Sequence, residues 1–248
     1  LSSPDTFPMG AHDVNAHDHL STIDEIIGFP YGIGPILAVL EELDTKGLSV
    51  RDGFGTAPDP CFSRGAESAI LPLQGMTSVE SPMGARMLMF WSAHCAFSNF
   101  HPAPITIDGH FFLSSEHYFM WAKAKTFNDE QMAEEILWAE TPADAKKLGR
   151  GVANFRKDVW GAGKSVRMMT IACYRKFQQN PLCRKALLST EGTVLVEAWP
   201  DKIWSNGIDP KHPGASHPAN WEGTNCLGRI LTVIREHMIS SKIYEDEL

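Results

Sequence analysis

Tryptophan and the turn-forming residues glycine and proline are distributed very unevenly along this 248-residue chain. Residues 1–86 contain 10 of the 20 glycines and 8 of the 16 prolines, but none of the seven tryptophans. Because large aromatic side chains dominate the burial of a core, the first third of the chain has little material for a core of its own. We therefore expect a largely irregular N-terminal extension at 1–86, a compact domain at 87–240 and an acidic tail at 241–248.

Two local patterns stand out within the extension. The apolar run at 36–43 follows a proline and predicts one short helix. A group of histidines and aspartates could bind a metal, but its Pro- and Gly-rich surroundings favour solvated side chains; the group comprises His12, Asp13, His17, Asp18 and His19. We therefore expect no metal site.

Charge and cysteine content argue against several classes of protein. The formal net charge is -8 and the pI is about 5.7, so no extended surface for nucleic-acid phosphates is expected, although a local nucleotide pocket is compatible with this charge. No apolar run reaches the roughly 18–20 residues of a membrane span, and the first residues lack the blocks of a signal peptide. The five cysteines form no C-x-x-C pair, which indicates reduced thiols in an intracellular, cytoplasmic protein.

Local signals in residues 87–240 predict several helices and a few short strands. The apolar run at 87–91 and the β-branched run at 193–199 are typical of strands. Asp108-Gly109 predicts the two-residue turn of a hairpin, Asn128 is expected to cap the helix that follows it, and Thr141-Pro142 predicts a helix start. Because helices and strands do not alternate one for one, we expect a helix-rich α+β single domain and not a doubly wound parallel sheet.

Glu116 and Lys123 lie seven residues apart in a segment predicted to be helical. Seven residues make almost two turns, so both side chains point the same way, with Phe119 and Met120 between them. A carboxylate and an amine on an apolar stripe are costly to desolvate unless they are paired or used, which favours a site. Taken alone, the pattern also fits a solvated Glu and Lys flanking a core helix.

Further candidates lie at the ends of predicted elements, where binding residues are common. They are Asn99, Phe100, Arg150, Asp201, Trp204, Asn225 and Gly228. Several have a structural alternative. The two asparagines fit turns or caps, the arginine fits a surface charge or a partner of the helix dipole, and the tryptophan fits a core.

In their order along the chain, these segments resemble the NADAR (YbiA-like) family. The resemblance covers about residues 90–238 and rests on successive blocks: F-S-N-F at 97–100, S-E-H-Y-F-M-W-A-K-A at 115–124, A-K-K-L-G-R at 145–150, Trp160, K-F-Q-Q-N at 176–180, L-V-E-A at 195–198, D-K-I-W at 201–204 and G-T-N-C-L-G-R-I-L at 223–231. One block would be a weak signal, whereas this many in order are specific.

The resemblance implies a helix-rich α+β fold and an enzyme that cleaves N-glycosidic bonds, a hydrolase without a metal or organic cofactor. Some members of the family act on phosphorylated riboflavin-pathway intermediates, and others remove ADP-ribose from modified guanine. The expected partner is therefore a small-molecule or base-linked ADP-ribose or phosphoribosyl substrate. Two alternatives remain open: a catalytically silent module that binds ADP-ribose or a nucleotide, and a scaffold protein whose activity lies in residues 1–86.

Chemistry and resemblance together suggest three catalytic residues. N-glycoside cleavage builds positive charge at the anomeric carbon, which a nearby carboxylate stabilises. We assign that role to Glu116, whose charged form a helix start favours, as suits a base or charge stabiliser. Lys123 either binds phosphate or forms a Schiff base with the opened sugar, and the resemblance favours the second role for members acting on ADP-ribose. Asp201 is expected to orient a ribose hydroxyl or water.

The remaining candidates are expected to bind the substrate. Asn99, Arg150 and Asn225 would hold phosphate or base, and the aromatic faces of Trp160 and Trp204 would stack on the base; Phe100, His117 and Gly228 complete the set. One position departs from the family pattern, which usually has Trp-Gly-x-Gly where this chain has W-S-N-G at 204–207. The serine at 205 is expected to narrow the pocket or alter specificity.

Overall fold

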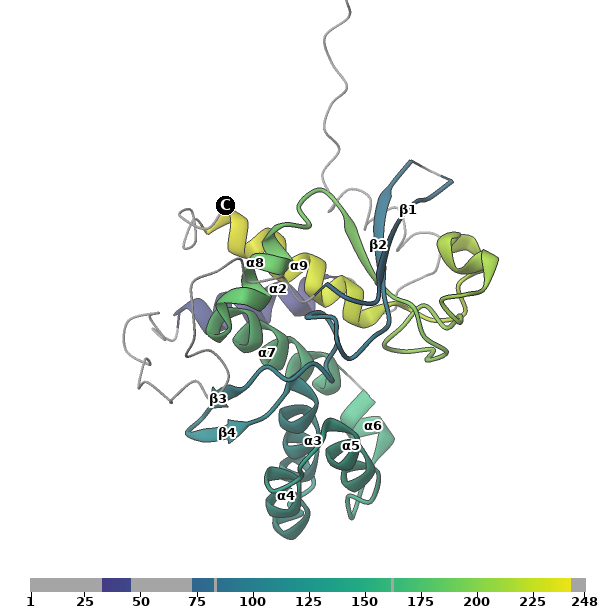
Figure 1. Ribbon diagram of the computed structural model, residues 1–248. Coiled ribbons are helices and arrows are strands. Elements are labelled where there is room, and N and C mark those ends of the chain that lie inside the picture. Colours follow the sequence, from purple (N-terminus) through teal and green to yellow (C-terminus); the bar gives the residue numbers. More distant parts are fainter. Residues whose placement is uncertain (1–32, 46–72, 83, 162, 242–248) are drawn as a thin grey trace, which may run out of the picture.

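The computed structural model describes residues 33–45, 73–82, 84–161 and 163–241. The described chain is made of helices and of short strands that form two small sheets, and Figure 1 shows the sheets apart from each other with helices between them. The helices are α2 (Gly34–Thr45), α3 (Ser115–Thr126), α4 (Glu130–Leu137), α5 (Pro142–Arg150), α6 (Lys157–Gly161), α7 (Lys164–Gln179), α8 (Pro181–Leu188) and α9 (Cys226–Ser240). The strands are β1 (Met76–Glu80), β2 (Arg86–Phe90), β3 (Ile105–Ile107), β4 (His110–Phe112) and β5 (Val194–Glu197). The expected helix-rich α+β class is confirmed.

The larger sheet has the order β1-β2-β5. Strand β2 pairs with β1 antiparallel and with β5 parallel, and Phe90 lies opposite Glu197 in the parallel pair. The predicted strands at 87–91 and 193–199 are thus both present: β2 begins and ends one residue earlier than predicted, and β5 is shorter at both ends. Because β2 and β5 run in the same direction, the chain leaves both strands at the same edge of the sheet, at Trp91 and Ala198.

Local sequence signals set the smaller elements. Strands β3 and β4 form the predicted hairpin, with positive φ angles of 49° at Asp108 and 79° at Gly109, which match the two-residue turn. Helix α5 begins as predicted, because Thr141 Oγ1 accepts a hydrogen bond of 3.1 Å from the backbone N of Asp144. The cap of α4 differs from expectation: Asp129, and not Asn128, accepts from a backbone N–H in the first turn.

The main hydrophobic core lies around α7 and α9. Helix α7 contacts α2, α3, α8, α9 and β3, and α9 packs against β5 with eleven of its 15 residues buried. In Figure 1, α7 separates the α3–α4–α5 group from α2, α8 and α9. This arrangement places the start of α3 close to the sheet edge where β2 and β5 end.

Two described elements of residues 1–86 belong to this core. Helix α2 covers the helix predicted at 36–43, and it buries Ile36, Val39 and Leu40 against α7 and α9. An ion pair of 2.6 Å between Glu42 and Arg167 reinforces the contact. Strand β1 adds the outer strand of the larger sheet. Helix α2 thus adds buried side chains to the core, and β1 packs against it with partly buried ones.

The described residues contain neither a helix suited to span a membrane nor a group suited to hold a metal ion. None of their helices combines the length and apolar character that crossing a membrane requires. Their histidines, cysteines and acidic residues form no group of three or more that could hold a metal ion. The histidine–aspartate group at 12–19 and the acidic segment from 242 lie outside the described residues.

Candidate active site

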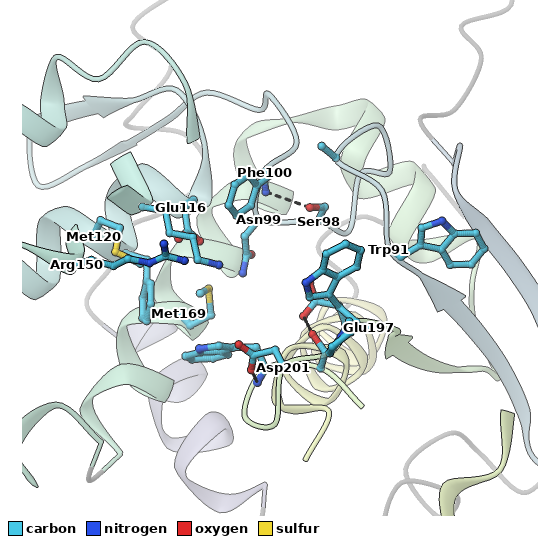
Figure 2. Close-up of a pocket in the computed structure, with 17 residues that line it drawn as sticks. Trp91, Ser98, Asn99, Phe100, Glu116, Met120, Arg150, Met169, Glu197 and Asp201 are labelled. Carbon is cyan, nitrogen blue, oxygen red and sulfur yellow. Dashed lines mark hydrogen bonds between the residues drawn. The ribbon is translucent and has the colours of Figure 1, made fainter. Parts of the chain in front are cut away.

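A cavity of about 570 Å³ opens at the edge where β2 and β5 end. Its walls come from the turn after β2, the first turn of α3, one face of α5, Met169 of α7 and the loop that follows β5. The volume lies within the usual range for small-molecule sites. Figure 2 shows charged side chains converging on this space from several of these elements. The cavity is the candidate active site.

Glu116 lies in the first turn of α3 and points into the cavity. Its backbone N donates to the Asn99 carbonyl at 3.2 Å, which fixes the helix start against the turn after β2. The side chain is buried, and its Oε1 has no hydrogen-bond partner among the described residues. Burial raises the pKa of the Glu116 carboxyl to about 7, with Glu197 and Asp201 adding to the effect against Lys146 and Arg150.

This pKa corrects the expectation that the helix start keeps Glu116 charged. A helix N-terminus stabilises a carboxylate by roughly 0.3–1 kcal/mol at an exposed site, whereas loss of hydration disfavours the charged form of a buried acid much more strongly. Desolvation therefore outweighs the dipole here. The raised pKa makes the protonated form accessible near neutral pH, so Glu116 is suited to donate a proton as well as to stabilise charge.

A second carboxylate in the cavity, half-buried, was not among the predicted site residues. Glu197 is the last residue of β5, and its Oε2 accepts a hydrogen bond of 2.6 Å from Ser205 Oγ. Burial raises the pKa of the Glu197 carboxyl to about 7, although the hydrogen bond from Ser205 opposes the rise. The sequence contained Glu197 only as part of the L-V-E-A block, with no local signal that its side chain enters a site.

Asp201, a predicted site residue, also lines the cavity. One of its oxygens, Oδ1, accepts hydrogen bonds from the backbone N–H groups of Ile203 at 2.9 Å and Trp204 at 2.7 Å. These bonds form a tight turn that places the Trp204 ring in the cavity wall, edge-on to Phe119 at 5.3 Å between centroids. Asp201 therefore shapes the loop as well as facing the cavity.

Two cations line the cavity from one face of α5. Arg150 was predicted, and Lys146 lies one helical turn before it. The Lys146 amine also lies 5.2 Å from the centre of the Phe100 ring, which belongs to the turn after β2. Asn99 and Phe100, both predicted, complete this side of the wall. The spacing of Lys146 and Arg150 was visible in the sequence but did not distinguish Lys146 from its neighbour Lys147.

Lys123, predicted as catalytic, is not among the residues that line the cavity, so the structure gives its predicted role no support. Its Nζ donates to the Gly149 carbonyl at 2.7 Å and lies 4.2 Å from the centre of the Phe155 ring. Helix α5 crosses α3 between Glu116 and Lys123, and Gly149 approaches Met120 so closely that a Cβ at 149 would collide with the Met120 side chain. The shared helical face is therefore divided by α5, with only Glu116 on the cavity side.

Four predicted binding residues also lie outside the cavity lining. His117 is buried between Ser114 Oγ, 2.8 Å from its Nδ1, and the Ala139 carbonyl, 3.2 Å from its Nε2, and burial lowers its pKa. Trp160 packs behind the wall, 5.2 Å from the Phe119 ring. Both side chains pack with α3. The sequence alone does not distinguish an aromatic ring that packs into the core from one that faces a cavity.

Asn225 and Gly228, the other two, hold α9 against β5. Asn225 has a positive φ of 49°; its Nδ2 donates to the Leu195 carbonyl at 3.0 Å and its Oδ1 accepts from the Glu197 backbone N at 2.9 Å. A Cβ on Gly228 would collide with the Leu195 carbonyl. Asn225 occupies the N-cap position of α9, but its side chain makes no capping hydrogen bond and instead bonds to β5, where it positions Glu197.

Two exposed aromatic residues at the cavity were missed by the sequence analysis. Trp91 follows β2 and Trp199 follows β5 by two residues, and their side chains are 37% and 55% exposed. Exposed rings beside a cavity are available for stacking on a planar ligand. A prediction that the two strands pair in parallel would have indicated both residues, because parallel pairing places both strand ends at the same edge of the sheet.

The NADAR domain model matches residues 89–239, which is more than half of the chain. The chain belongs to the NADAR family. Relatives include protein irg-1 of Caenorhabditis elegans, 36% identical over 168 residues, which cover 61% of this chain and 79% of that protein. N-glycosidase YbiA of Escherichia coli is 33% identical over 147 residues, covering 59% of this chain and 82% of YbiA.

A third relative of this NADAR chain is a riboflavin biosynthesis protein of Vibrio vulnificus, 34% identical over 146 residues. The match covers 58% of this chain but only 36% of that protein. Among solved structures, the NMR structure of E. coli YbiA has a TM-score of 0.54 and 29% identity, and the alignment covers 70% of this chain and 94% of YbiA. The fold of the NADAR domain is therefore shared with YbiA.

Ser205 stands where the resemblance led us to expect a glycine, and the structure shows where its hydroxyl lies. The side chain is buried in the cavity wall and bonds to Glu197. A glycine at this position would have no hydroxyl to donate. The substitution thus adds a hydrogen-bond donor beside a carboxylate of the site, and its effect on specificity stays a prediction.

Proposed function

We propose that this NADAR protein is a hydrolase that cleaves an N-glycosidic bond in a nucleotide-like substrate. The observation that carries the proposal is one cavity that contains two carboxylates, the buried Glu116 and the half-buried Glu197, beside two cations. Keeping carboxyl groups in a site of low dielectric is costly, and such pairs commonly serve acid–base chemistry. Relatives named N-glycosidases support the same reaction class.

The proposed chemistry follows from the charge that develops as the bond breaks. Departure of the base leaves positive charge on the anomeric carbon and ring oxygen, which carboxylates stabilise. The leaving nitrogen needs a proton, and a carboxyl group with a pKa of about 7 can supply one near neutral pH. Glu116 meets this need because it is buried and its Oε1 is free to face a ligand.

The walls of the cavity suggest the substrate class. Lys146 and Arg150 form a cationic side suited to phosphate oxygens, while Trp91 and Trp199 offer flat apolar surfaces suited to a base. A phosphoribosyl or ADP-ribosyl group joined to a heterocyclic base has both features. We therefore propose either a riboflavin-pathway intermediate or an ADP-ribosylated base as the substrate.

A substrate panel tests the proposal. Wild-type protein is expected to release free base from a phosphoribosyl riboflavin intermediate or from ADP-ribosylated guanine, measured by chromatography of the base and sugar. The unphosphorylated riboside should be cleaved at least about tenfold less efficiently, because it cannot pair with the cations. Binding of ADP-ribose without release of any base would contradict the enzyme and favour a silent binding module.

Two lysines provide a matched comparison within that panel. Lys146→Met removes a cation from the cavity and is expected to raise KM for the phosphorylated substrate about 10-fold or more. Lys123→Met removes an amine that bonds to Gly149 outside the cavity lining, so kcat and KM should stay within about threefold of wild type. Borohydride should trap no adduct on Lys123 during turnover. A trapped adduct, or a reversed pattern between the two variants, would contradict this assignment.

Trp199 is expected to contribute to recognition of the base. Trp199→Ala should raise KM about 5- to 100-fold, since stacking of one base on an aromatic ring is worth roughly 1–3 kcal/mol, while kcat changes little. The measurement is steady-state kinetics on the best substrate of the panel. Trp138, 80% exposed at the end of α4 and outside the cavity lining, is the matched control. Equal effects of the two alanine variants would refute the stacking role.

A further inference from the structure

Glu116 and Glu197 enter the cavity from different sides, as Figure 2 shows. One comes from the first turn of α3 and the other from the end of β5. Two carboxyl groups on different sides of a ligand can act on its two faces, one at the leaving group and one at the attacking water. The arrangement raises the question of which carboxyl group has which role.

The hydrogen bonds of the two groups differ. Glu197 is fixed twice: its backbone N donates to Asn225 Oδ1 at 2.9 Å, and its Oε2 accepts from Ser205 Oγ at 2.6 Å. Glu116 is fixed only through its backbone N, and its Oε1 accepts no hydrogen bond within the part of the chain that the structure describes. A donated hydrogen bond stabilises the ionised form of an acid, so this geometry favours the negative charge on Glu197.

The charged surroundings of both groups are shared. The charges of Asp201 and Lys146 act on both carboxyl groups, and that of Arg150 acts on Glu116. The thiols of Cys173 and Cys226 also interact electrostatically with Glu197. Two acids that interact in one buried site titrate as a pair, and ionisation of one disfavours ionisation of the other. With the charge placed on Glu197 by the serine hydroxyl, the proton of the pair resides on Glu116.

We propose that Glu197 is the base that activates water, that Glu116 is the acid that protonates the leaving group, and that Ser205 is a positioning residue for Glu197. This assignment rests on the proposed N-glycosidase function. The bond between the anomeric carbon and the base nitrogen breaks, and its electron pair stays on the nitrogen, which takes the proton of Glu116. Water adds to the anomeric carbon and gives a proton to Glu197, which returns it through solvent to Glu116.

The roles can be separated with two leaving groups. On an N-glycoside, Glu116→Gln and Glu197→Gln should each lower kcat about 10²–10⁴-fold. On p-nitrophenyl riboside 5-phosphate, whose leaving group needs no proton, Glu116→Gln should recover to within about tenfold of wild type, while Glu197→Gln should not. Added formate should restore activity to Glu197→Ala by supplying the missing carboxylate.

Ser205 is tested by the pH profile of kcat/KM. A base must be ionised, so activity falls as pH drops through its pKa. Ser205→Ala removes the donor that favours the ionised form, and the acidic limb should therefore move to higher pH; Ser205→Thr keeps a hydroxyl and should restore the wild-type limb. Thermal unfolding of each variant checks the fold, and a purely structural role of Ser205 would change Tm without moving the limb.

The outcomes distinguish the two proposals. Two results would overturn the assignment of roles while the N-glycosidase function stands. In the first, wild type cleaves N-glycosides and Glu197→Gln retains the wild-type kcat. In the second, it is Glu197→Gln, and not Glu116→Gln, that regains activity on the p-nitrophenyl substrate. If wild type cleaves no N-glycoside and no p-nitrophenyl riboside, the proposed function fails and the assignment fails with it.

Discussion

Glutamine in place of Glu116 is expected to lower kcat for N-glycoside cleavage about 10²–10⁴-fold, the usual contribution of one acid–base group. Glutamine keeps the shape of the side chain but can neither donate the proton nor carry the charge. KM should change much less, because Lys146, Arg150 and the two tryptophans at the cavity remain in place. The measurement is steady-state release of base near pH 7.

The stability of the same variant separates chemistry from misfolding. In the folded protein the pKa of Glu116 is raised to about 7 by burial, so the folded state holds a proton that the unfolded state loses at lower pH. Stability therefore decreases as pH rises from the ordinary pKa of a glutamate to about 7, and above pH 7 the buried charge opposes folding. Glu116→Gln removes that charge, so its Tm at pH 8 should equal or exceed that of wild type.

Glu134, an exposed acid on α4, provides the control. Glu134→Gln should retain wild-type kcat and KM, because the side chain lies outside the cavity lining. Wild-type turnover in Glu116→Gln would show that Glu116 is not the acid of the site. A large fall in Tm of that variant would instead assign the lost activity to the fold.

Alanine in place of Gly228 is expected to destabilise the domain by about 3 kcal/mol or more. Its Cβ would meet the Leu195 carbonyl and the Asn225 side chain, and neither can withdraw because both belong to the buried contact between β5 and α9. The matching fall in Tm is about 6 °C or more for a domain of this size. Thermal unfolding followed by circular dichroism provides the measurement.

Gly34 in α2 is the matched glycine for this experiment. A Cβ there would meet no atom within 4 Å, so Gly34→Ala should change stability by no more than about 1 kcal/mol, and in the stabilising direction. Equal Tm values for the two alanine variants would contradict the close packing of α9 on β5. That packing also carries Asn225, so the folded fraction of Gly228→Ala should show reduced activity.

Elements with strong local signals could be predicted from the sequence. The Asp108-Gly109 turn and the Thr141 cap before Pro142 each depend on a few neighbouring residues, and both occur where expected. The α+β class also followed, because it depends on the kinds of elements and their order. The cap at Asp129 was missed in favour of Asn128, since both residue types cap helices well and only the backbone geometry selects between them.

The candidate site could be predicted only where a residue reaches the cavity from the end of its own element. Of the residues predicted for the site, Asn99, Phe100, Arg150, Asp201 and Trp204 line the cavity, and their roles stay predictions, whereas Asn225 bonds to β5 from the start of α9. Glu116 and Lys123 share a helical face by their spacing, yet the crossing of α5 at Gly149 leaves one on each side. Local periodicity contains no information about where another helix crosses.

The sequence by itself pointed to several local elements, to the family and to two of the acids that line the cavity, Glu116 and Asp201. Only the tertiary structure decided that β2 pairs in parallel with β5, more than 100 residues later in the chain. That pairing brings Trp91, Glu197 and Trp199 to one cavity and sets Ser205 against the second carboxylate. The physical reason is that parallel pairing and helix crossings depend on burial shared between distant segments, which neighbouring residues do not specify.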